Sequence, residues 1–183
     1  MDIRKIHTGN LKEEAKTLCA GEKVFLSGTV FTARDAAHAR LFSMLDNNEP
    51  LPFELSGAVI YYAGPTPRKP DGQIGSFGPT TSARMDVFSP RLLDLGLAAM
   101  IGKGNRSEEV IASIKKNGAV YFCAGGGFGA LISKSITDMQ EIAFPELGCE
   151  SVKRLEICDL PLIVGVDANG KSIFNRENRN RNG

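Results

Sequence analysis

Three short apolar runs in the middle of the chain constrain its fold most strongly. They are GAVIYYA (57–63), LAAMI (97–101) and AVYFCA (119–124), and they contain almost no polar residue. Runs of this kind are typical of strands that are buried on both faces, as in a parallel sheet covered by helices. Helical patterns separate the runs, so the sequence predicts strand–helix–strand units with right-handed parallel crossovers.

Cap residues mark where the helices between these strands begin. Thr32 is followed three residues later by Asp35, a pattern that resembles a capping box and predicts a helix over residues 32–45. Serine as a cap and proline in the first turn predict a second helix that begins at Ser89–Pro90. Apolar spacing and glycine boundaries predict further helices over residues 10–20, 107–116 and 130–136.

The last third of the chain predicts short strands. RLEIC, LIVGVD and KSIF are expected as strands, with Asp167-Ala168-Asn169-Gly170 as a turn between the last two. Together with a strand over residues 22–31, the sequence predicts an α/β fold with a parallel sheet portion and additional antiparallel strands. We expect a single domain over residues 1–174, followed by a polar tail over residues 175–183.

The charge and hydropathy of the chain argue against nucleic-acid and membrane partners. Its 183 residues carry 22 basic and 21 acidic side chains, a net charge of +1. This balance argues against nucleic-acid binding, which needs a basic excess on one face. No apolar run reaches the roughly 18 residues of a membrane span, and the N-terminal segment lacks the apolar core of a signal peptide. We therefore expect a cytoplasmic protein with no nucleic-acid or membrane partner.

The cysteines argue against a metal site built by this chain alone. Cys19, Cys123, Cys149 and Cys158 are widely spaced and form no CxxC pair, so they do not predict a complete cysteine-ligated site. Cys123 and Cys158 lie in apolar runs and are expected to be buried as small apolar side chains.

A long loop is the first candidate for a site. Residues 64–86 read GPTPRKPDGQIGSFGPTTSARMD, with four glycines, four prolines and almost no aliphatic residue. We expect no core residue in it, and structureless loops beyond about 12–15 residues are usually functional or disordered. The segment ends with Thr80, Thr81 and Arg84, two hydroxyls and a guanidinium. On spacing alone, it predicts an anion-binding site.

Other candidate groups lie near predicted element ends. Arg34 falls in the first turn of the helix expected from Thr32, where a guanidinium and free backbone N–H groups favour an anion; pairing with a neighbouring carboxylate is its simpler role. His38 lies one turn later on the same face. Lys103 lies between two glycines in the GKG turn that joins a strand to a helix, where α/β sheets bind ligands. AGGG (124–127) also joins a strand to a helix and is a weaker candidate for an anion-binding turn.

These segments occur together in a distinctive order. They are SGTVFTARDAAHARL (27–41), YYAGPTPRKPDGQIGSFGPTTSARMD (61–86), MIGKGNRS (100–107), AGGGFGALISKSI (124–136) and LEICDLPLIVGVDANG (155–170). Over about residues 10–174, the chain resembles the β subunit, or C-terminal domain, of the iron–sulfur class I fumarate hydratases and the related L-tartrate dehydratases. The GPTTSxRMD segment is the most specific part of this resemblance.

The resemblance implies a swivelling β/β/α three-layer domain and a hydro-lyase activity, the reversible hydration of fumarate to malate. It also implies a [4Fe–4S] cluster that acts as a Lewis acid and is held by three cysteines of an α subunit, so that this chain binds no metal. The chain is then one subunit of an enzyme that acts on a C4 dicarboxylate. A heterotetramer is expected for the assembled enzyme, or a homodimer for the isolated chain.

The resemblance also implies roles for the candidate residues. Thr80 is the base that removes the proton from carbon, while Arg84 and Lys103 hold a carboxylate and stabilise the alkoxide. Arg34 and Thr81 complete substrate binding, and a shift of one residue in the loop would exchange Thr81 with Thr80. His38 matches the family pattern without an assigned role.

Two other functions remain compatible with the sequence. An L-tartrate dehydratase β subunit would share every motif named above. A stand-alone anion-binding module without catalysis is the other, although such a module would not need a threonine beside two cations.

Overall fold

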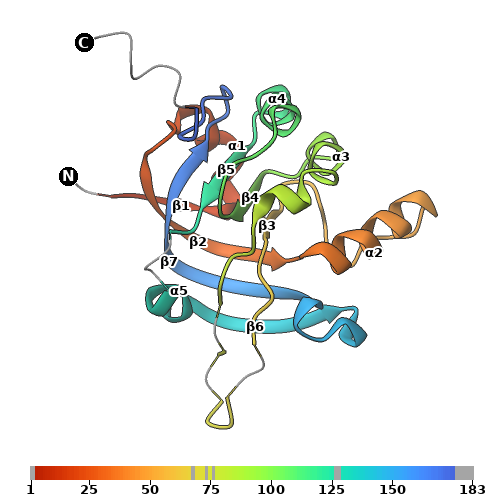
Figure 1. Cartoon of the computed structure of the whole chain (residues 1–183). Coiled ribbons are helices and arrows are strands. Elements are labelled where there is room, and N and C mark those ends of the chain that lie inside the picture. The colour runs from red at the N-terminus through yellow and green to blue at the C-terminus, as the bar shows by residue number, and fades with distance from the viewer. Residues whose placement is uncertain (1–2, 67–68, 73, 76, 126–128, 176–183) are drawn as a thin grey trace, which may run out of the picture.

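The computed structural model describes residues 3–66, 69–72, 74–75, 77–125 and 129–175, in which strands form one mixed sheet (Figure 1). The strands are β1 (Arg4–His7), β2 (Lys23–Thr32), β3 (Val59–Tyr61), β4 (Ala99–Gly102), β5 (Val120–Cys123), β6 (Ile136–Ala143) and β7 (Val152–Val166). Their order is β1-β2-β3-β4-β5-β7-β6, and β2 also pairs with β7. Strands β2, β3, β4, β5 and β7 therefore close into a barrel-like ring.

Parallel and antiparallel pairs both occur, as the sequence predicts. The pairs β1–β2, β2–β3, β3–β4 and β4–β5 are parallel, whereas β7 runs antiparallel to β2, β5 and β6. Helices connect the parallel strands: α2 leads from β2 to β3, α3 precedes β4, and α4 leads from β4 to β5. The predicted strand–helix–strand units are confirmed.

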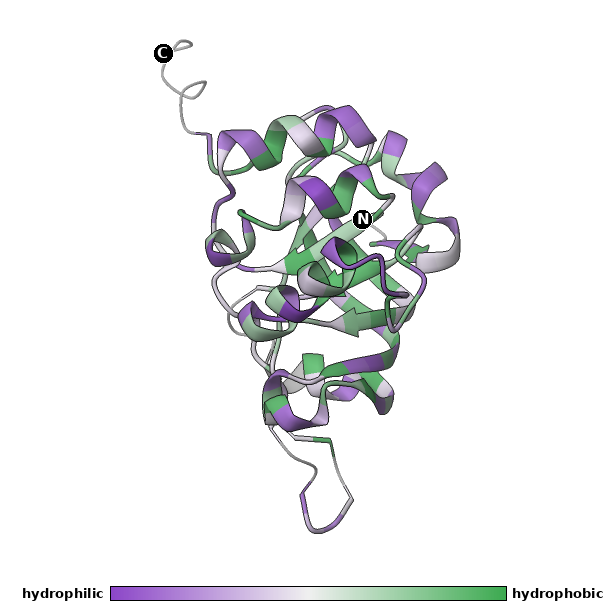
Figure 2. Cartoon of the chain, turned by 90° about the vertical axis from the view of Figure 1, so that its right-hand side faces the viewer, coloured by the Kyte–Doolittle hydropathy of each residue, from purple (hydrophilic) through white to green (hydrophobic). Residues whose placement is uncertain are grey.

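The helices lie outside the strands. They are α1 (Leu11–Glu14), α2 (Asp35–Asp46), α3 (Ser89–Asp94), α4 (Glu108–Asn117) and α5 (Gly129–Ser135), with 3-10 turns η1 (Thr8–Asn10), η2 (Ala15–Thr17), η3 (Ser82–Met85) and η4 (Pro145–Glu150). Figure 1 shows α2, α3 and α4 together along one side, and in Figure 2 their outward faces are mostly hydrophilic while the strands are mostly hydrophobic. None of the described helices has the length and apolarity needed to cross a membrane.

The apolar runs have no alternation because both strand faces are covered. In β3, Val59 and Tyr61 belong to the core enclosed by the strands, whereas Ile60 packs in a second core with residues of α2, α3 and α4. In β5, Phe122 likewise faces the first core and Tyr121 the second. This two-sided burial is the physical reason for the continuous apolar runs.

Helix α4 forms as its sequence predicts. The Ser107 hydroxyl caps it by accepting a hydrogen bond from the Val110 amide at 3.3 Å, and Gly118 ends it in the left-handed conformation at φ 63°. One other predicted start is wrong. Thr32 ends β2 instead of capping α2, because its hydroxyl bonds the backbone of the neighbouring β7 segment. The start predicted at Ser89–Pro90 is confirmed, since α3 begins at Ser89 with proline in its first turn, but the N-cap is Phe88 and not Ser89.

The first predicted helix is shorter than expected. Residues 10–20 form α1 for one turn and then tighten into η2, and Leu18 is already extended. The predicted apolar stripe is confirmed, because Leu11, Ala15 and Leu18 are all buried. These three side chains belong to the core enclosed by the strands.

The strand predictions at both ends of the chain are incomplete. The sequence does not predict β1 or β6, and it predicts two strands where the single strand β7 forms. β6 is a partly exposed edge strand, and its polar sequence ITDMQEIA carries little strand signal. KSIF forms one isolated bridge, between Val166 and Ser172, instead of a strand. The tail predicted over residues 175–183 lies outside the described residues beyond Asn175.

Two burial predictions are also wrong. Phe77 and Met85, in the long loop, are buried with 2% and 0% exposure, so this loop does contribute to the core. Cys158 is exposed, because it alternates along β7 with the buried Leu155 and Ile157 and therefore lies on the opposite face of the strand. Residues 69–72 are exposed and lie far from the core, beyond β6 (Figure 1).

Candidate functional site

The residues selected from the sequence gather at one edge of the sheet. Arg34 lies two residues after β2, and Lys103 directly follows β4. The Thr80 amide donates a 2.7 Å hydrogen bond to the carbonyl of Tyr62, the residue after β3. Thr81 then pairs with Lys103 as an isolated bridge. The carboxyl ends of parallel strands, where α/β proteins commonly bind ligands, therefore carry all four candidates.

Arg84 connects the loop hydroxyl to a carboxylate of α2. Its Nη2 donates to Thr80 Oγ1 at 2.5 Å, and its Nε lies 3.4 Å from Asp35 Oδ1. Thr80 is partly buried, whereas Thr81 and Arg84 are exposed. A guanidinium that already bonds a hydroxyl is well placed to stabilise it as an alkoxide. Thr80 is the threonine whose hydroxyl contacts Arg84.

Arg34 is held loosely between two carboxylates. It occupies the N-cap position of α2 instead of the predicted first turn, because its backbone is extended. Its Nε is 3.6 Å from Glu150 Oε1, and its Nη2 is 3.9 Å from Asp35 Oδ2. Both distances exceed those of good hydrogen bonds, and Arg34 Nε and Glu150 Oε1 are buried without a hydrogen-bond partner among the described residues. The donors of Arg34 are therefore not saturated by its ion pairs.

His38 lies in the interior of the protein and shares no exposed surface with Arg34. Its side chain is fully buried, and its ring lies 5.6 Å from the Tyr62 ring and 5.2 Å from the Phe88 ring. Burial lowers the pKa of His38 to about 4, so the ring is neutral at pH 7. Its Nδ1 lies 2.8 Å from the Arg34 carbonyl oxygen, which requires Nδ1 to donate. His38 therefore anchors the Arg34 backbone.

Lys103 is fixed through its backbone. Its carbonyl accepts from the Ser82 amide at 3.0 Å, and its own amide donates to Ser82 Oγ at 3.0 Å. This close contact requires glycine at position 102, because a Cβ there would lie 1.9 Å from Ser82 Oγ. The Lys103 side chain itself is exposed. The first glycine of the GKG segment, Gly102, thus lets the long loop pack against the end of β4.

A buried arginine that the sequence analysis did not select anchors the other end of the loop. The Arg106 side chain has 0% exposure, and its Nε donates to Asp86 Oδ1 at 2.6 Å. Its Nη2 donates to Ser89 Oγ at 2.6 Å, and its guanidinium lies 4.9 Å from the Tyr121 ring. Both Asp86 and Arg106 lie in segments that carry the family resemblance, but a separation of 20 residues gives no sign that they pair.

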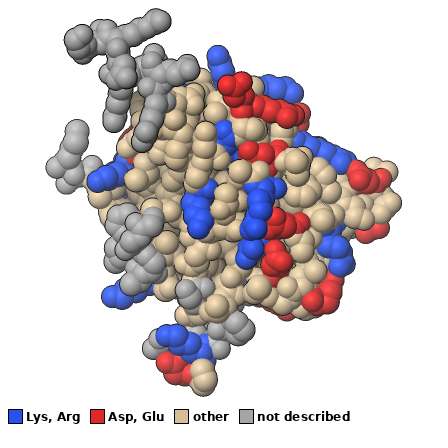
Figure 3. All heavy atoms as spheres, in the orientation of Figure 1, with Lys and Arg blue, Asp and Glu red and all other residues tan. Residues whose placement is uncertain are grey.

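The charges at this edge favour an anion, because three cations outnumber the two carboxylates, Asp35 and Glu150, that lie beside the arginines. Arg34, Arg84 and Lys103 supply three cations, and Asp35 contacts both arginines at 3.4–3.9 Å. Figure 3 shows basic and acidic side chains interspersed over the face in view, with no single continuous basic surface. A ligand carboxylate would compete with Asp35 for the guanidiniums, which bind planar carboxylates in bidentate fashion.

Among the described residues, the cysteines do not gather. Cys123 is buried in β5, whereas Cys19, Cys149 and Cys158 are exposed. In that part of the chain, no three His, Cys, Asp or Glu side chains lie close enough together to hold a metal ion. An iron–sulfur cluster needs several thiolates around it, so the described donors of this chain do not fit one.

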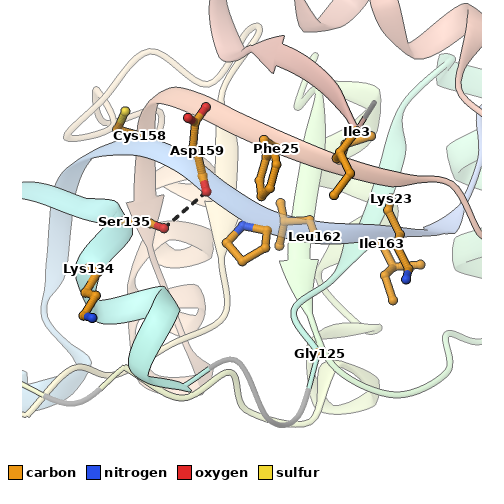
Figure 4. A pocket seen from close by; sticks show the side chains of 12 residues that line it. Ile3, Lys23, Phe25, Gly125, Lys134, Ser135, Cys158, Asp159, Leu162 and Ile163 are labelled. Atoms are coloured by element: carbon orange, nitrogen blue, oxygen red, sulfur yellow. Dashed lines mark hydrogen bonds between the residues drawn. The ribbon is translucent and has the colours of Figure 1, made fainter. Parts of the chain in front are cut away.

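A separate cavity of about 380 Å³ lies between β2, β7 and the end of α5 (Figure 4). Phe25, Leu162 and Ile163 give it apolar walls, and Ser135 donates a 3.3 Å hydrogen bond to the Asp159 carbonyl at its rim. The cavity adjoins the start of β2, whereas the candidate site follows its end. At about 3.3 Å per residue, a strand of this length separates the two by roughly 25 Å, so the cavity is not part of the site. Within the AGGG segment, Gly125 lines this cavity and not the candidate site, whereas residues 126 and 127 lie outside the described part.

Comparisons with known proteins show the family to which the chain belongs. The family model described as "Fumarase C-terminus" matches residues 2–177. The chain is 40% identical over 169 residues to fumarate hydratase 2 of Leishmania major, and this alignment covers 91% of the chain and 30% of that protein. It is 39% identical over 155 residues to the aerobic class I fumarate hydratase of Escherichia coli, covering 83% of the chain and 28% of that protein.

A shorter relative is matched along most of its length. The chain is 30% identical over 180 residues to the L(+)-tartrate dehydratase subunit beta of Escherichia coli, which covers 94% of the chain and 87% of that subunit. The chain thus spans under a third of the two fumarate hydratases but most of this subunit.

Proposed function

This chain belongs to the fumarase C-terminus family, and from that premise we propose that it is the β subunit of a hydro-lyase that interconverts fumarate and malate. The observation that carries the proposal is the contact of Thr80 Oγ1 with Arg84 at 2.5 Å, at the strand edge that also holds Arg34 and Lys103. A hydroxyl in that setting has the cations that an alkoxide base requires.

The proposed roles follow from the chemistry of elimination. Removal of water from malate takes a proton from one carbon and hydroxide from the next, and Thr80 accepts the proton. Arg84 donates to the Thr80 oxygen and stabilises its negative charge, while the ammonium of Lys103 adds a second cation. Arg34 binds a substrate carboxylate, because its loose ion pairs leave donors for a planar anion. Thr81 lines the site as a binding residue.

The proposal requires a partner. We assign the [4Fe–4S] cluster and its Lewis-acid chemistry to an α subunit, since the described donors of this chain do not fit it and one relative is named a β subunit. In this proposal, residues 1–174 act as one swivelling β/β/α domain that presents the strand edge to that partner. The isolated chain should then be colourless and inactive.

L-tartrate dehydration is the second candidate reaction. The observation that favours it is the similarity to 87% of the tartrate dehydratase subunit beta. Both reactions eliminate water from a C4 dicarboxylate and use the same groups of this chain. Anaerobic co-expression with an α subunit, followed by assays on malate, fumarate and both tartrates, distinguishes the two. Dicarboxylate binding without turnover of any of these would instead indicate an anion-binding module.

Replacement of the two threonines tests the proposed base. Thr80→Val keeps the shape of the side chain and removes the hydroxyl, so kcat should fall by about 10²–10⁴ with little change in KM. Thr81→Val is the matched control and should be mild. Exchange of the substrate C3 hydrogen with deuterated solvent should be lost in Thr80→Val alone. If exchange is lost only in Thr81→Val, the base is the neighbouring residue; if it survives in both, the base lies on the partner.

A further inference from the structure

A buried set of hydrogen bonds joins the Lys103 turn to the loop that carries Thr80 and Arg84. Ser82 Oγ accepts from the Lys103 amide at 3.0 Å, and it lies 2.9 Å from the hydroxyl oxygen of Tyr121. The Tyr121 hydroxyl also lies 2.9 Å from the carbonyl oxygen of Gly104. The set therefore begins and ends on the backbone of the Lys103 turn.

The directions of these bonds follow from the available protons. Tyr121 has a single hydroxyl proton, and the Gly104 carbonyl can only accept, so Tyr121 donates to Gly104. Ser82 then donates its proton to the Tyr121 oxygen while it accepts from the Lys103 amide. Every donor and acceptor in the set is used once in a consistent direction, and such chains strengthen each bond in a low-dielectric interior.

Ser82 and Tyr121 are shielded from water. Both have 0% exposure, and burial raises the pKa of Tyr121, so its hydroxyl stays protonated and able to donate at pH 7. An unpaired polar group at either position would be costly. Because breaking either hydrogen bond would leave a buried polar group unpaired, the two side chains are held in a single arrangement.

The Lys103 turn needs such an anchor. Gly102 and Gly104 flank it, and glycine leaves the backbone many conformations. Ser82 holds the amide and carbonyl of Lys103, and Tyr121 holds the next carbonyl. Of three successive backbone groups around an exposed cation, two are thus held by Ser82, two residues after Thr80, and the third by Tyr121 of β5.

We propose that Ser82 and Tyr121 are positioning residues that set the placement of the Lys103 ammonium relative to Thr80 and Arg84. They do not contact the substrate, and they act by fixing the two backbones that carry the three reacting or charge-bearing groups. The inference rests on the proposed hydro-lyase function, in which these groups work together. It adds residues on a loop and on β5 to that function.

Tyr121→Phe in the complex with the α subunit is the principal test. It removes one oxygen and keeps the ring that packs on Arg106, so the fold should persist. A displacement of about 1 Å can cost up to about 10²-fold in rate, so we expect kcat to fall by about 10- to 10²-fold, with KM changed far less. Tyr61→Phe is the matched control, because the buried Tyr61 hydroxyl has no hydrogen-bond partner among the described residues; it should retain wild-type kcat.

Amide hydrogen exchange on the full-length chain supplies a readout that does not depend on turnover. In Ser82→Ala, the Lys103 amide loses its acceptor, so its exchange should accelerate by about tenfold or more, the effect expected from losing roughly 1.4 kcal/mol of protection. Exchange in β4 and β5 should remain at wild-type rates. This result would establish local anchoring by Ser82.

Three results would overturn the proposal. The first is a kcat of Tyr121→Phe equal to that of Tyr61→Phe. The second is unchanged exchange of the Lys103 amide in Ser82→Ala, and the third is faster exchange spread over all strands, which would indicate a general loss of stability. If the wild-type complex hydrates no dicarboxylate, the proposed function fails, whereas the exchange result still decides whether Ser82 holds the turn.

Discussion

Replacement of Arg106 by methionine should destabilise this chain strongly. Methionine has a similar length but cannot pair with Asp86, whose side chain is only 13% exposed, and the Arg106 side chain itself is fully buried. The change removes two charge-assisted hydrogen bonds of 2.6 Å, to Asp86 and to Ser89. Among the described residues, Asp86 then keeps the bond from the Ser107 amide alone, so a nearly buried carboxylate loses its cation. Breaking such a pair typically costs about 3–5 kcal/mol.

Urea and thermal unfolding, followed by circular dichroism, measure this cost. For a chain of this length, about 3–5 kcal/mol corresponds to a decrease in Tm of roughly 6–20 °C. A double-mutant cycle with Asp86→Asn separates the ion pair from the lost packing, because asparagine retains an acceptor for the Ser107 amide. Arg106→Met should cost about 1–3 kcal/mol less in the Asp86→Asn background. An equal cost in both backgrounds would refute the reasoning that the buried pair provides the stability.

Three further predictions concern the site and its surroundings. Arg84→Lys should recover little of the activity lost in Arg84→Ala in steady-state assays, because lysine keeps the charge without the planar fork; full recovery would mean that only the charge matters. Gly102→Ala should lower stability by about 1–3 kcal/mol in urea unfolding, since its Cβ would meet Ser82 Oγ at 1.9 Å, whereas Gly78→Ala, with nothing within 4 Å, should be neutral. For His38, the pKa of about 4 in the folded protein lies below the unfolded value of 6.5. The stability that the buried neutral ring provides is therefore complete above pH 6.5 and is lost as pH falls toward 4. Between pH 7 and pH 5, the wild type should lose about 2 kcal/mol more stability than His38→Gln, which does not titrate; parallel losses would contradict this assignment.

Local sequence patterns predicted those features that neighbouring residues decide. The apolar runs that became β3, β4 and β5 identified strands covered on both faces, because the pattern directly reflects burial. The cap at Ser107 and the glycine at position 118 delimited α4 through contacts within one turn. The segments around Arg34, Thr80 and Lys103 identified the candidate groups, and parallel strands then brought them to one edge.

Long-range contacts decided the rest. Pairing of β2 with β7 joins residues more than 120 positions apart, closes the ring, and recruits the Thr32 hydroxyl away from α2. The pairs of Arg106 with Asp86 and of Ser82 with Tyr121 likewise depend on the long loop packing beside the ends of β4 and β5. Such contacts depend on how distant segments meet and carry no fixed spacing, so one sequence cannot show them. The sequence by itself determined the strand–helix–strand pattern and the residues suited to bind an anion. The tertiary structure decided which of these residues contact one another, because such contacts join segments that are far apart in the sequence.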